Sequence, residues 1–337
     1  MKARRTWLVV TASLLVVLPL GAICVVWLGA SASLDWQYRH STATQTLPTQ
    51  ATGTRAVIRI PTGKYAFRAR IAGVGGARGN LILLHGFAES STMWQPLITT
   101  AAQAGYQVLA FDQRGYSPGA RPEDAASYTL AALAKDVHSV ARARGFRSFH
   151  LVGHGWGALV GWQLVLGGGD KPDTWTALSM PHGAAFQQAR DSDPEQRRRS
   201  RYLEFMMLPW LPEQILAFNR FEILRQTLWQ GRSEQQVAEY TAILGEPGAL
   251  RAVTSWFRAP ASAMPPHATL NVPTLLVWGN RDPFLAPSTV AGHRALVAKS
   301  AAHPVRELEL DGGHRLLGSH TKLVTDAILK HLQSPDQ

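Results

Sequence analysis

One stretch of the sequence decides the fold: residues 149–158 read FHLVGHGWGA. An apolar run is followed by small residues and then by a helical pattern, which predicts a strand, a sharp turn and a helix. This is the layout of a nucleophile elbow, in which small residues two before and two after the central residue let the chain turn tightly. Gly153 and Gly157 hold the two flanking positions, but the central residue is Gly155, which has no side chain.

Short apolar runs lie on both sides of this stretch. Several are continuous rather than alternating, as expected of parallel strands that are buried on both faces. Helical stretches separate them, and strands that alternate with helices predict a doubly wound α/β fold with a mostly parallel sheet. The predicted strands are residues 56–60, 65–71, 81–84, 108–111, 149–152, 176–180, 274–278 and 305–310.

One interval breaks this alternation. Residues 183–263 contain no convincing strand and read as several helices, after which a strand pattern returns at Val272. We therefore expect an all-helical cap inserted into the sheet domain, over the carboxyl edge of the sheet, where open α/β sheets place their active sites. The predicted domains are an α/β core of residues 55–182 and 264–333 and a cap of residues 183–263.

The amino-terminal segment has a different composition. Lys2, Arg4 and Arg5 precede an uncharged, largely apolar stretch from Trp7 to Ala32, which is long enough to span a bilayer. This predicts a signal anchor in residues 1–34 that crosses the membrane through residues 7–32. The alternative is a signal peptide cleaved after the small residues that end at Ala32.

The positive charges at the amino end predict that the main domain lies outside the cytoplasm, anchored to the membrane, or secreted if the signal is cleaved. Residues 35–54 are rich in Ser, Thr, Gln and Ala and predict a linker. The single cysteine, Cys24, belongs to the amino-terminal segment, so the predicted core and cap contain no thiol.

Composition excludes several classes of protein. Of the 337 residues 46% are hydrophobic, which is too many for a disordered chain, and one cysteine is too few for a disulfide scaffold. The net charge of +11 is spread over the first half of the chain without forming one stripe, and no nucleic-acid-binding module accompanies it. No His or Cys spacing suits a metal, and no glycine-rich phosphate loop follows a strand. We expect no nucleic acid, metal or cofactor.

Five motifs occur in order at predicted strand ends: LLHGF at 83–87, FDQRGYS at 111–117, the elbow, WGNRD at 278–282 and DGGH at 311–314. Together they resemble the α/β-hydrolase superfamily, and within it the epoxide hydrolase and haloalkane dehalogenase branch, over about residues 55–333. In that branch an Asp in a Gly-His-Asp-Trp-Gly elbow attacks the substrate. A His and a second acid then drive hydrolysis of the covalent ester.

The resemblance assigns roles to residues of this chain. His314 would be the general base and Asp282 the acid that orients it. The backbone N–H groups of Phe87 and Trp156 would form the oxyanion hole. Gly155 would stand at the nucleophile position with the side chain lost.

The cap and the oxyanion loop supply the expected substrate-binding residues. Tyr202 matches the tyrosine with which epoxide hydrolases bind the epoxide oxygen, whereas Phe257 falls where a second cap tyrosine is often found. His85 would order the oxyanion loop beside the substrate. Ala88 replaces the proline that usually follows His-Gly-Phe in epoxide hydrolases.

Other polar residues have structural interpretations. His154 is expected to pack, since the side chain beside the elbow centre points away from the site, and His182 lies at the predicted cap hinge. Asp112 is expected to pair with Arg114 or to cap a turn. Three serines lack the geometry of the elbow and are disfavoured as substitute nucleophiles: Ser90, Ser91 and Ser179.

Two functions stay open. Without a carboxylate at residue 155 no alkyl-enzyme ester can form there, but His314 and Asp282 could activate water to hydrolyse a small apolar epoxide or ester. The alternative is a non-catalytic pseudo-hydrolase that binds an apolar ligand or a partner at the membrane surface. A sequence variant of an ordinary epoxide hydrolase is a third, trivial interpretation. The oligomeric state is not predicted.

Overall fold

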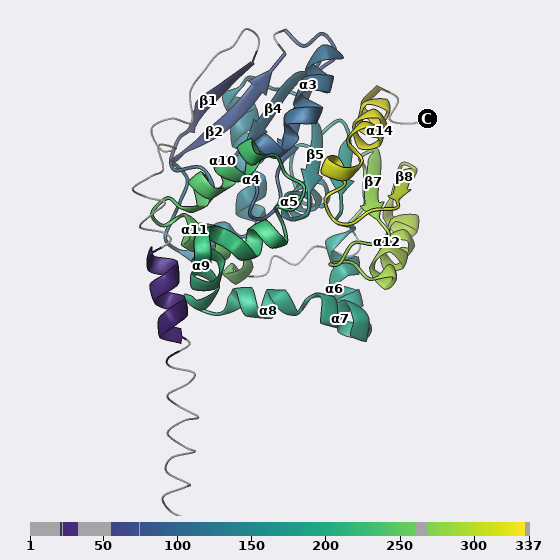
Figure 1. The fold of residues 1–337 in the computed structure, drawn as a ribbon. Coiled ribbons are helices and arrows are strands. Elements are labelled where there is room, and N and C mark those ends of the chain that lie inside the picture. The colour runs from purple at the N-terminus through teal and green to yellow at the C-terminus, as the bar shows by residue number, and fades with distance from the viewer. Residues whose placement is uncertain (1–20, 22, 33–54, 74, 261–267, 334–337) are drawn as a thin grey trace, which may run out of the picture.

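The computed structural model describes residues 21, 23–32, 55–73, 75–260 and 268–333. At the centre of these residues is one eight-stranded sheet with the order β1-β2-β4-β3-β5-β6-β7-β8 (Figure 1). The β1–β2 and β2–β4 pairs are antiparallel and the others are parallel. The strands are β1 (Arg55–Thr62), β2 (Tyr65–Ala72), β3 (Asn80–Leu84), β4 (Gln107–Phe111), β5 (His150–His154), β6 (Trp175–Leu178), β7 (Thr274–Gly279) and β8 (Val305–Leu310).

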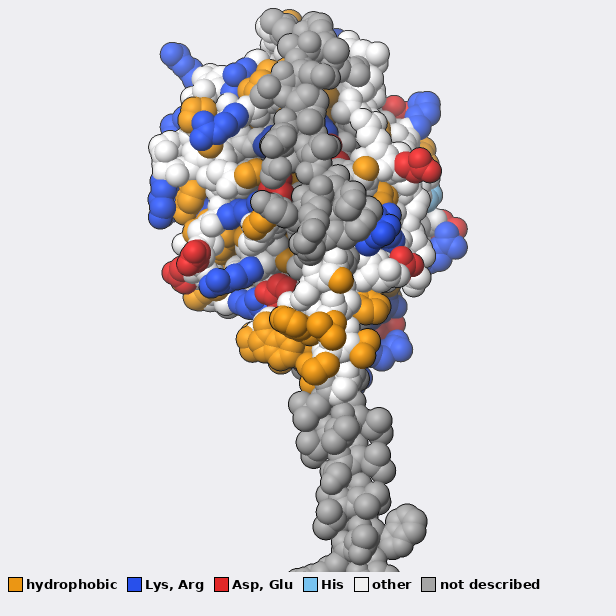
Figure 2. All heavy atoms as spheres, turned by 60° about the vertical axis from the view of Figure 1, so that its left-hand side comes forward, with side chains coloured by type: hydrophobic (Ala, Val, Ile, Leu, Met, Phe, Trp, Pro, Cys, Tyr) orange, Lys and Arg blue, Asp and Glu red, His pale blue; other side chains and the backbone are white. Residues whose placement is uncertain are grey.

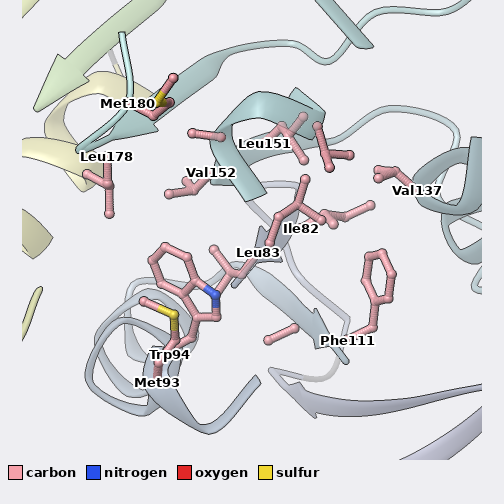
Figure 3. Packing of buried hydrophobic residues seen from close by; sticks show 14 of the residues in the cluster. Ile82, Leu83, Met93, Trp94, Phe111, Val137, Leu151, Val152, Leu178 and Met180 are labelled. Carbon is pink, nitrogen blue, oxygen red and sulfur yellow. The ribbon is translucent and has the colours of Figure 1, made fainter. Parts of the chain in front are cut away.

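All eight predicted strands are present, with ends shifted by two residues at most. The central strands β3, β5 and β6 were readable because both of their faces are buried, so the apolar residues run on without alternation. Figure 3 shows Leu83 of β3 and Val152 of β5 in the core beside Trp94, together with Val137 from a flanking helix. The mostly parallel α/β prediction is confirmed.

Helices cover both faces of the sheet. α4 and α5 pack on each other and on one face, whereas α3 and α14 pack together on the other. Thr129 caps α4, its hydroxyl accepting a hydrogen bond from the Ala132 N–H. The helices of the sheet domain are η1 (Ser91–Trp94), α3 (Gln95–Gln103), η2 (Ala125–Tyr128), α4 (Leu130–Ala143), α5 (Trp156–Leu166), α12 (Pro287–Ser300), α13 (Leu316–Ser319) and α14 (Thr321–Gln333).

Between β6 and β7 the described chain is helical. Six helices lie there: α6 (Gly183–Ser192), α7 (Pro194–Arg199), α8 (Arg201–Met207), α9 (Leu211–Gln226), α10 (Glu234–Leu244) and α11 (Ala249–Arg258). We call this insertion the cap. Figure 1 shows α8, α9 and α11 beyond the edge of the sheet at which β5 ends and α5 begins.

Two breaks divide the helices of the cap. α7 ends before Ser200, and α8 begins at the next residue. α9 contains a kink at Phe218–Phe221, where Asn219, Arg220 and Phe221 have positive φ.

Buried side chains of the cap bond to the core. The Trp229 indole N–H donates to the Ala88 carbonyl at 2.7 Å, and the Trp256 indole N–H donates to the Arg114 carbonyl at 2.9 Å. Both tryptophans are 2% exposed. The cap is therefore held against the two core loops that follow β3 and β4.

A short helix precedes the core. Residues 23–32 are helical, and Ala30 is fully buried. A Cβ atom on Gly29 would lie 2.6 Å from the Phe218 ring, so this N-terminal helix contacts α9. Most of the predicted membrane segment and all of the linker, 35–54, lie outside the described residues. Within the part of the chain that the structure describes, no helix is both long and apolar enough to cross a membrane.

Candidate active site

The turn after β5 is as tight as the sequence predicts. A Cβ atom on Gly153 would lie 2.6 Å from the Gly157 carbonyl oxygen, and one on Gly157 would lie 2.3 Å from the Leu84 carbonyl oxygen. No side chain fits at either position, which explains the two glycines. Gly155 between them has φ +52° and ψ −115°, and α5 starts at the next residue.

His314 and Asp282 lie together at the carboxyl edge of the sheet. The Nδ1 atom of His314 is 2.7 Å from Oδ2 of Asp282, whose side chain is fully buried. The second oxygen, Oδ1, accepts the Phe284 N–H at 2.8 Å. Because the carboxylate is held at both oxygens, it fixes the ring of His314 with Nδ1 as donor and leaves Nε2 as the basic nitrogen.

The loop that carries His314 is also held. Its backbone carbonyl accepts a hydrogen bond from the Ser179 hydroxyl at 2.7 Å and lies 3.0 Å from Nε2 of His154. Ser179 follows β6 and His154 ends β5, so two neighbouring strands position this loop. The orientation of the imidazole is therefore set at its ring and at its backbone.

The basic nitrogen of His314 faces Gly155. A Cβ atom placed on Gly155 with ideal geometry would lie 3.2 Å from Nε2 of His314, the nearest atom to it. The elbow centre, the base and the acid, which are far apart in the sequence, are thus brought to one place.

The loop after β3 is ordered by His85. Its Nε2 accepts the Gln113 N–H at 3.0 Å, so Nδ1 carries the proton and donates to the Gly86 carbonyl at 2.8 Å. The Tyr116 hydroxyl accepts the Ala88 N–H at 2.7 Å. His85 is fully buried and does not line the pocket, so the structure places it behind the loop and not against a substrate.

The two predicted oxyanion residues flank the elbow. Trp156 is the first residue of α5, so its N–H belongs to the amides that a helix leaves without an internal partner. Phe87 lies on the loop after β3, and both side chains line the same pocket as Gly155 and His314. The structure thus brings both residues to the site.

A largely apolar cavity of about 520 Å³ contains these groups. This volume is typical of pockets for small molecules. Its walls come from the core and from α6, α8, α9 and α11 of the cap. Tyr202 and Phe257 of the cap both line it.

The sheet order, the elbow and the His314–Asp282 pair agree with a family match over most of the core. Residues 79–317 match the model of the α/β-hydrolase fold family. The chain belongs to the α/β-hydrolase fold family.

Its relatives fall in the epoxide hydrolase-like branch of this family. The human protein named epoxide hydrolase 4 is 28% identical over 244 residues, 69% of this chain and 67% of the relative. Epoxide hydrolase A of Mycobacterium tuberculosis is 29% identical over 296 residues, 75% and 89% of the two chains. The crystal structure of Bacillus megaterium epoxide hydrolase with an inhibitor superimposes with a TM-score of 0.72 at 21% identity, covering 82% of this chain and all of that one.

This α/β-hydrolase has an aromatic wall in its cap. The ring of Phe257 packs edge-on against Phe87 and Trp156, with ring centres 4.8 and 4.7 Å apart, and the ring of Tyr202 lies 6.4 Å from Phe257. Burial raises the pKa of the Tyr202 phenol above its usual range, and the charge of Asp282 raises it further. Tyr202 therefore stays protonated and can donate a hydrogen bond.

A buried ionic network joins the cap to the core and is not evident from the sequence. Glu89 contacts Arg232 of the cap at 2.5 Å through Oε1 and Nδ1 of His154 at 3.0 Å through Oε2. Burial alone would raise the pKa of Glu89, but Arg232 and then His154 outweigh it and hold this pKa well below the usual range. The network joins the cap to the loop of His314, because His154 also contacts the His314 carbonyl.

Other sequence interpretations had mixed outcomes. Asp112 pairs with Arg68 and accepts the Ser91 N–H, so the expected pairing with Arg114 is wrong. Arg114 instead forms a buried ion pair with Asp136 on α4. The packing role expected for His154 understated its polar contacts with Glu89 and His314.

The remaining polar residues occupy structural positions. Ser90 donates to Glu239 at 2.7 Å, and Ser179 donates to the His314 backbone. His182 caps α6 by accepting the Ala184 N–H and lies outside the pocket. Within the described ranges, no group of three or more His, Cys, Asp or Glu side chains is placed to hold a metal ion.

Proposed function

We propose that this protein hydrolyses a small apolar epoxide or ester with a water molecule that His314 and Asp282 activate directly. The observation that carries this proposal is the 3.2 Å between Nε2 of His314 and the Cβ position of Gly155. Gly155 and His314 line the same cavity, so a water molecule bound at Nε2 of His314 would lie next to an oriented base, where the resembled epoxide hydrolases carry an aspartate. Retention of the base, its acid and the oxyanion loop supports catalysis.

For an epoxide the proposed step is a single displacement. A water oxygen attacks a ring carbon while its proton moves to Nε2 of His314, and the C–O bond of the ring breaks. Tyr202 donates a hydrogen bond to the leaving oxygen, the proton held on Nε2 of His314 passes to that oxygen through water, and the products are a diol and the neutral imidazole. For an ester, the same water adds to the carbonyl carbon and the amides of Phe87 and Trp156 bind the oxyanion. The C–O bond to the alcohol then breaks, and the leaving oxygen takes the proton from Nε2 of His314, which gives an acid and an alcohol.

The second candidate function is an apolar-ligand-binding protein without catalysis. The absence of any side chain at Gly155 favours it, because removal of a nucleophile lowers catalysis by orders of magnitude. The apolar cavity under the cap would suit such a ligand equally well.

We further propose that residues 7–32 anchor the protein to a membrane with the hydrolase domain outside the cytoplasm. The uncharged stretch and the cations at Lys2, Arg4 and Arg5 support this topology. The contact of Gly29 with Phe218 supports retention of the segment, since cleavage after Ala32 would remove the N-terminal helix from the cap.

The decisive experiment compares the parent with His314→Gln and Asp282→Asn on styrene oxide and 4-nitrophenyl butyrate. We expect each variant to lose about 10²–10⁴-fold in kcat, the usual contribution of a general base. His303→Gln, which changes a histidine outside the pocket, serves as the matched control and should keep full activity. Equal rates in parent and His314→Gln would reject the hydrolase in favour of the binding protein.

A single turnover in ¹⁸O-labelled water tests the direct route. Water attack on the ring carbon places ¹⁸O in the diol in the first turnover. A covalent ester to a protein carboxylate would instead place an unlabelled oxygen there. An unlabelled first-turnover diol would contradict the mechanism.

A further inference from the structure

Large hydrophobic side chains are exposed at one end of the molecule. Ile23, Val25, Trp27 and Leu28 on the N-terminal helix are 42–64% exposed. Met207, Leu208, Trp210, Phe218 and Ile223 on the cap are 39–60% exposed. We call these nine residues the apolar collar. Among the described residues, Leu323 on α14 is the one other large hydrophobic side chain with comparable exposure.

The two halves of the collar meet. The N-terminal helix packs Gly29 against the ring of Phe218, so its exposed face continues the exposed face of α9. Figure 2 shows hydrophobic side chains gathered at the end of the molecule that carries this helix. A patch of this kind on a folded protein marks an interaction surface.

Strained backbone lies in the collar and directly beside it. Trp210 has φ +53°, and Asn219, Arg220 and Phe221 in the kink of α9 also have positive φ. Non-glycine residues rarely adopt this backbone conformation and keep it only where the surroundings enforce it. The strain lies in the segments that present Trp210 and Phe218 to the outside.

The active-site cavity reaches the surface inside the collar. Met207 and Ile223 line the cavity with His314 and Gly155, yet they are 60% and 44% exposed. A side chain that lines a cavity and is also exposed to solvent lies where the cavity opens to the surface. The cavity therefore has an opening among the apolar side chains of α8 and α9.

We propose that the collar rests in the surface of a lipid bilayer, so that apolar substrates enter the active site from the lipid. The chain itself indicates this occupant. The N-terminal helix is the last part of the uncharged stretch from Trp7 to Ala32, so the predicted anchor joins the domain at the collar. A bilayer would bury the exposed side chains on both halves together. The inference rests on the proposed hydrolase only for the nature of the substrate.

The test places labels on full-length protein bound to phosphatidylcholine vesicles. In a Cys24→Ser background, Trp210→Cys, Ile223→Cys and, as a matched control, Leu323→Cys each carry an environment-sensitive fluorophore. We expect a blue shift and strong quenching by lipids with a doxyl group near the glycerol backbone for labels at 210 and 223. The label at 323 should stay in water and unquenched.

Two results would overturn the proposal. Labels at 210 and 223 that behave like the label at 323 on vesicles would show that the collar stays in water. A blue shift that depends on protein concentration and ignores the lipid quencher would show that a second copy covers the collar. Neither readout needs activity, so failure of the hydrolase, measured with His314→Gln, is distinguishable from failure of the collar.

A variant outside the pocket tests the entry route. Leu208→Ser/Trp210→Ser removes collar side chains that do not line the cavity. We expect turnover of a long-chain epoxide dissolved in vesicles to fall several-fold, while turnover of a short, water-soluble epoxide stays unchanged. An equal effect on both substrates would contradict entry from the lipid.

Discussion

The Nε2 atom of His314 lies 3.2 Å from the position that a Cβ atom on Gly155 would occupy. Around this gap the base is paired with Asp282, its backbone is held by Ser179 and His154, and the loop of Phe87 is ordered by His85. The groups around Gly155 are therefore in place. The chemistry of the site depends on the side chain, or the water, that faces Nε2 of His314.

Gly155→Asp should create a covalent route. The new carboxylate would lie beside His314, attack an epoxide carbon and form an ester that water then hydrolyses. We expect turnover of styrene oxide to rise on the order of 10³-fold, in line with the effect of nucleophiles elsewhere, and stability to fall by about 1–3 kcal/mol because φ is positive at this residue. Intact-protein mass spectrometry of Gly155→Asp/His314→Gln should show the trapped ester.

Gly155→Asn is the matched control for that variant. Asparagine has the size of aspartate and tolerates positive φ equally well, but it lacks the nucleophilic carboxylate. It should show the same loss of stability with no ester. An adduct in neither variant would mean that the site is not competent for the covalent reaction.

Tyr202→Phe should separate epoxides from esters. The Tyr202 phenol stays protonated and can stabilise the oxygen released from an epoxide ring, an interaction of about 1.5–3 kcal/mol that corresponds to roughly 10–100-fold in kcat/KM. Ester hydrolysis, in which backbone amides bind the oxyanion, should change little. Phe257→Tyr should add a second donor and raise the epoxide rate. An equal loss for both substrate classes would assign Tyr202 to packing.

Arg232→Met should destabilise the protein more than removal of an exposed charge. Glu89 would remain buried without its cap partner, and breaking a buried ion pair costs about 3–5 kcal/mol. Urea unfolding measures this loss. Arg225→Met, which removes an exposed arginine of α9, should cost less than about 1 kcal/mol, and Glu89→Gln/Arg232→Met should recover part of the loss. Similar losses of unfolding free energy in Arg232→Met and Arg225→Met would contradict a stabilising buried ion pair between Glu89 and Arg232.

Buried histidines should make the protein acid-sensitive. Burial lowers the pKa of His293 to about 3, with a further contribution from His182, and burial lowers those of His182 and His331 to about 4. The folded state keeps these rings neutral, whereas the unfolded chain protonates them below pH about 6.5. Above pH 6.5 these rings are neutral in both states and do not affect the free energy of unfolding. As the pH falls from 6.5 toward 4, the unfolded chain binds protons that the folded state does not, so the free energy of unfolding decreases.

Chemical denaturation between pH 7 and pH 4 measures this dependence. In the parent the backbone N–H of His182 donates to the ring of His293. Glutamine in His293→Gln keeps an acceptor for this N–H but does not titrate. It should flatten the pH profile, and an unchanged slope would contradict the assignment. The same variant should leave the activity at pH 7 unaltered, since His293 lies outside the pocket.

The fold was readable because its signals are local. Continuous apolar runs identify β3, β5 and β6 since both faces of these strands are buried, and close backbone contacts at Gly153 and Gly157 explain the small residues of the elbow. His314 and Asp282 were found from motifs that follow strand ends. These features need no knowledge of which distant segments meet.

The ionic network was not readable because its members are distant in the chain. Arg232 and Glu89 are 143 residues apart, and nothing near either residue indicates the other. Asp112 was assigned to Arg114, a near neighbour, whereas its partner Arg68 belongs to the adjacent strand β2. The direction of His85 behind its loop likewise depends on the Gln113 backbone and not on the motif around it.

Trp229, Trp256 and Arg232 hold the cap against the core, and this limits how a ligand can reach the cavity. Moving the cap away from the core would break two indole hydrogen bonds and leave the Glu89 carboxylate buried without its arginine, at a large cost in free energy. We therefore expect the cap to stay closed and ligands to enter the cavity between its side chains, past exposed lining residues such as Met207 and Ile223. A closed cap would select ligands by width more than by length.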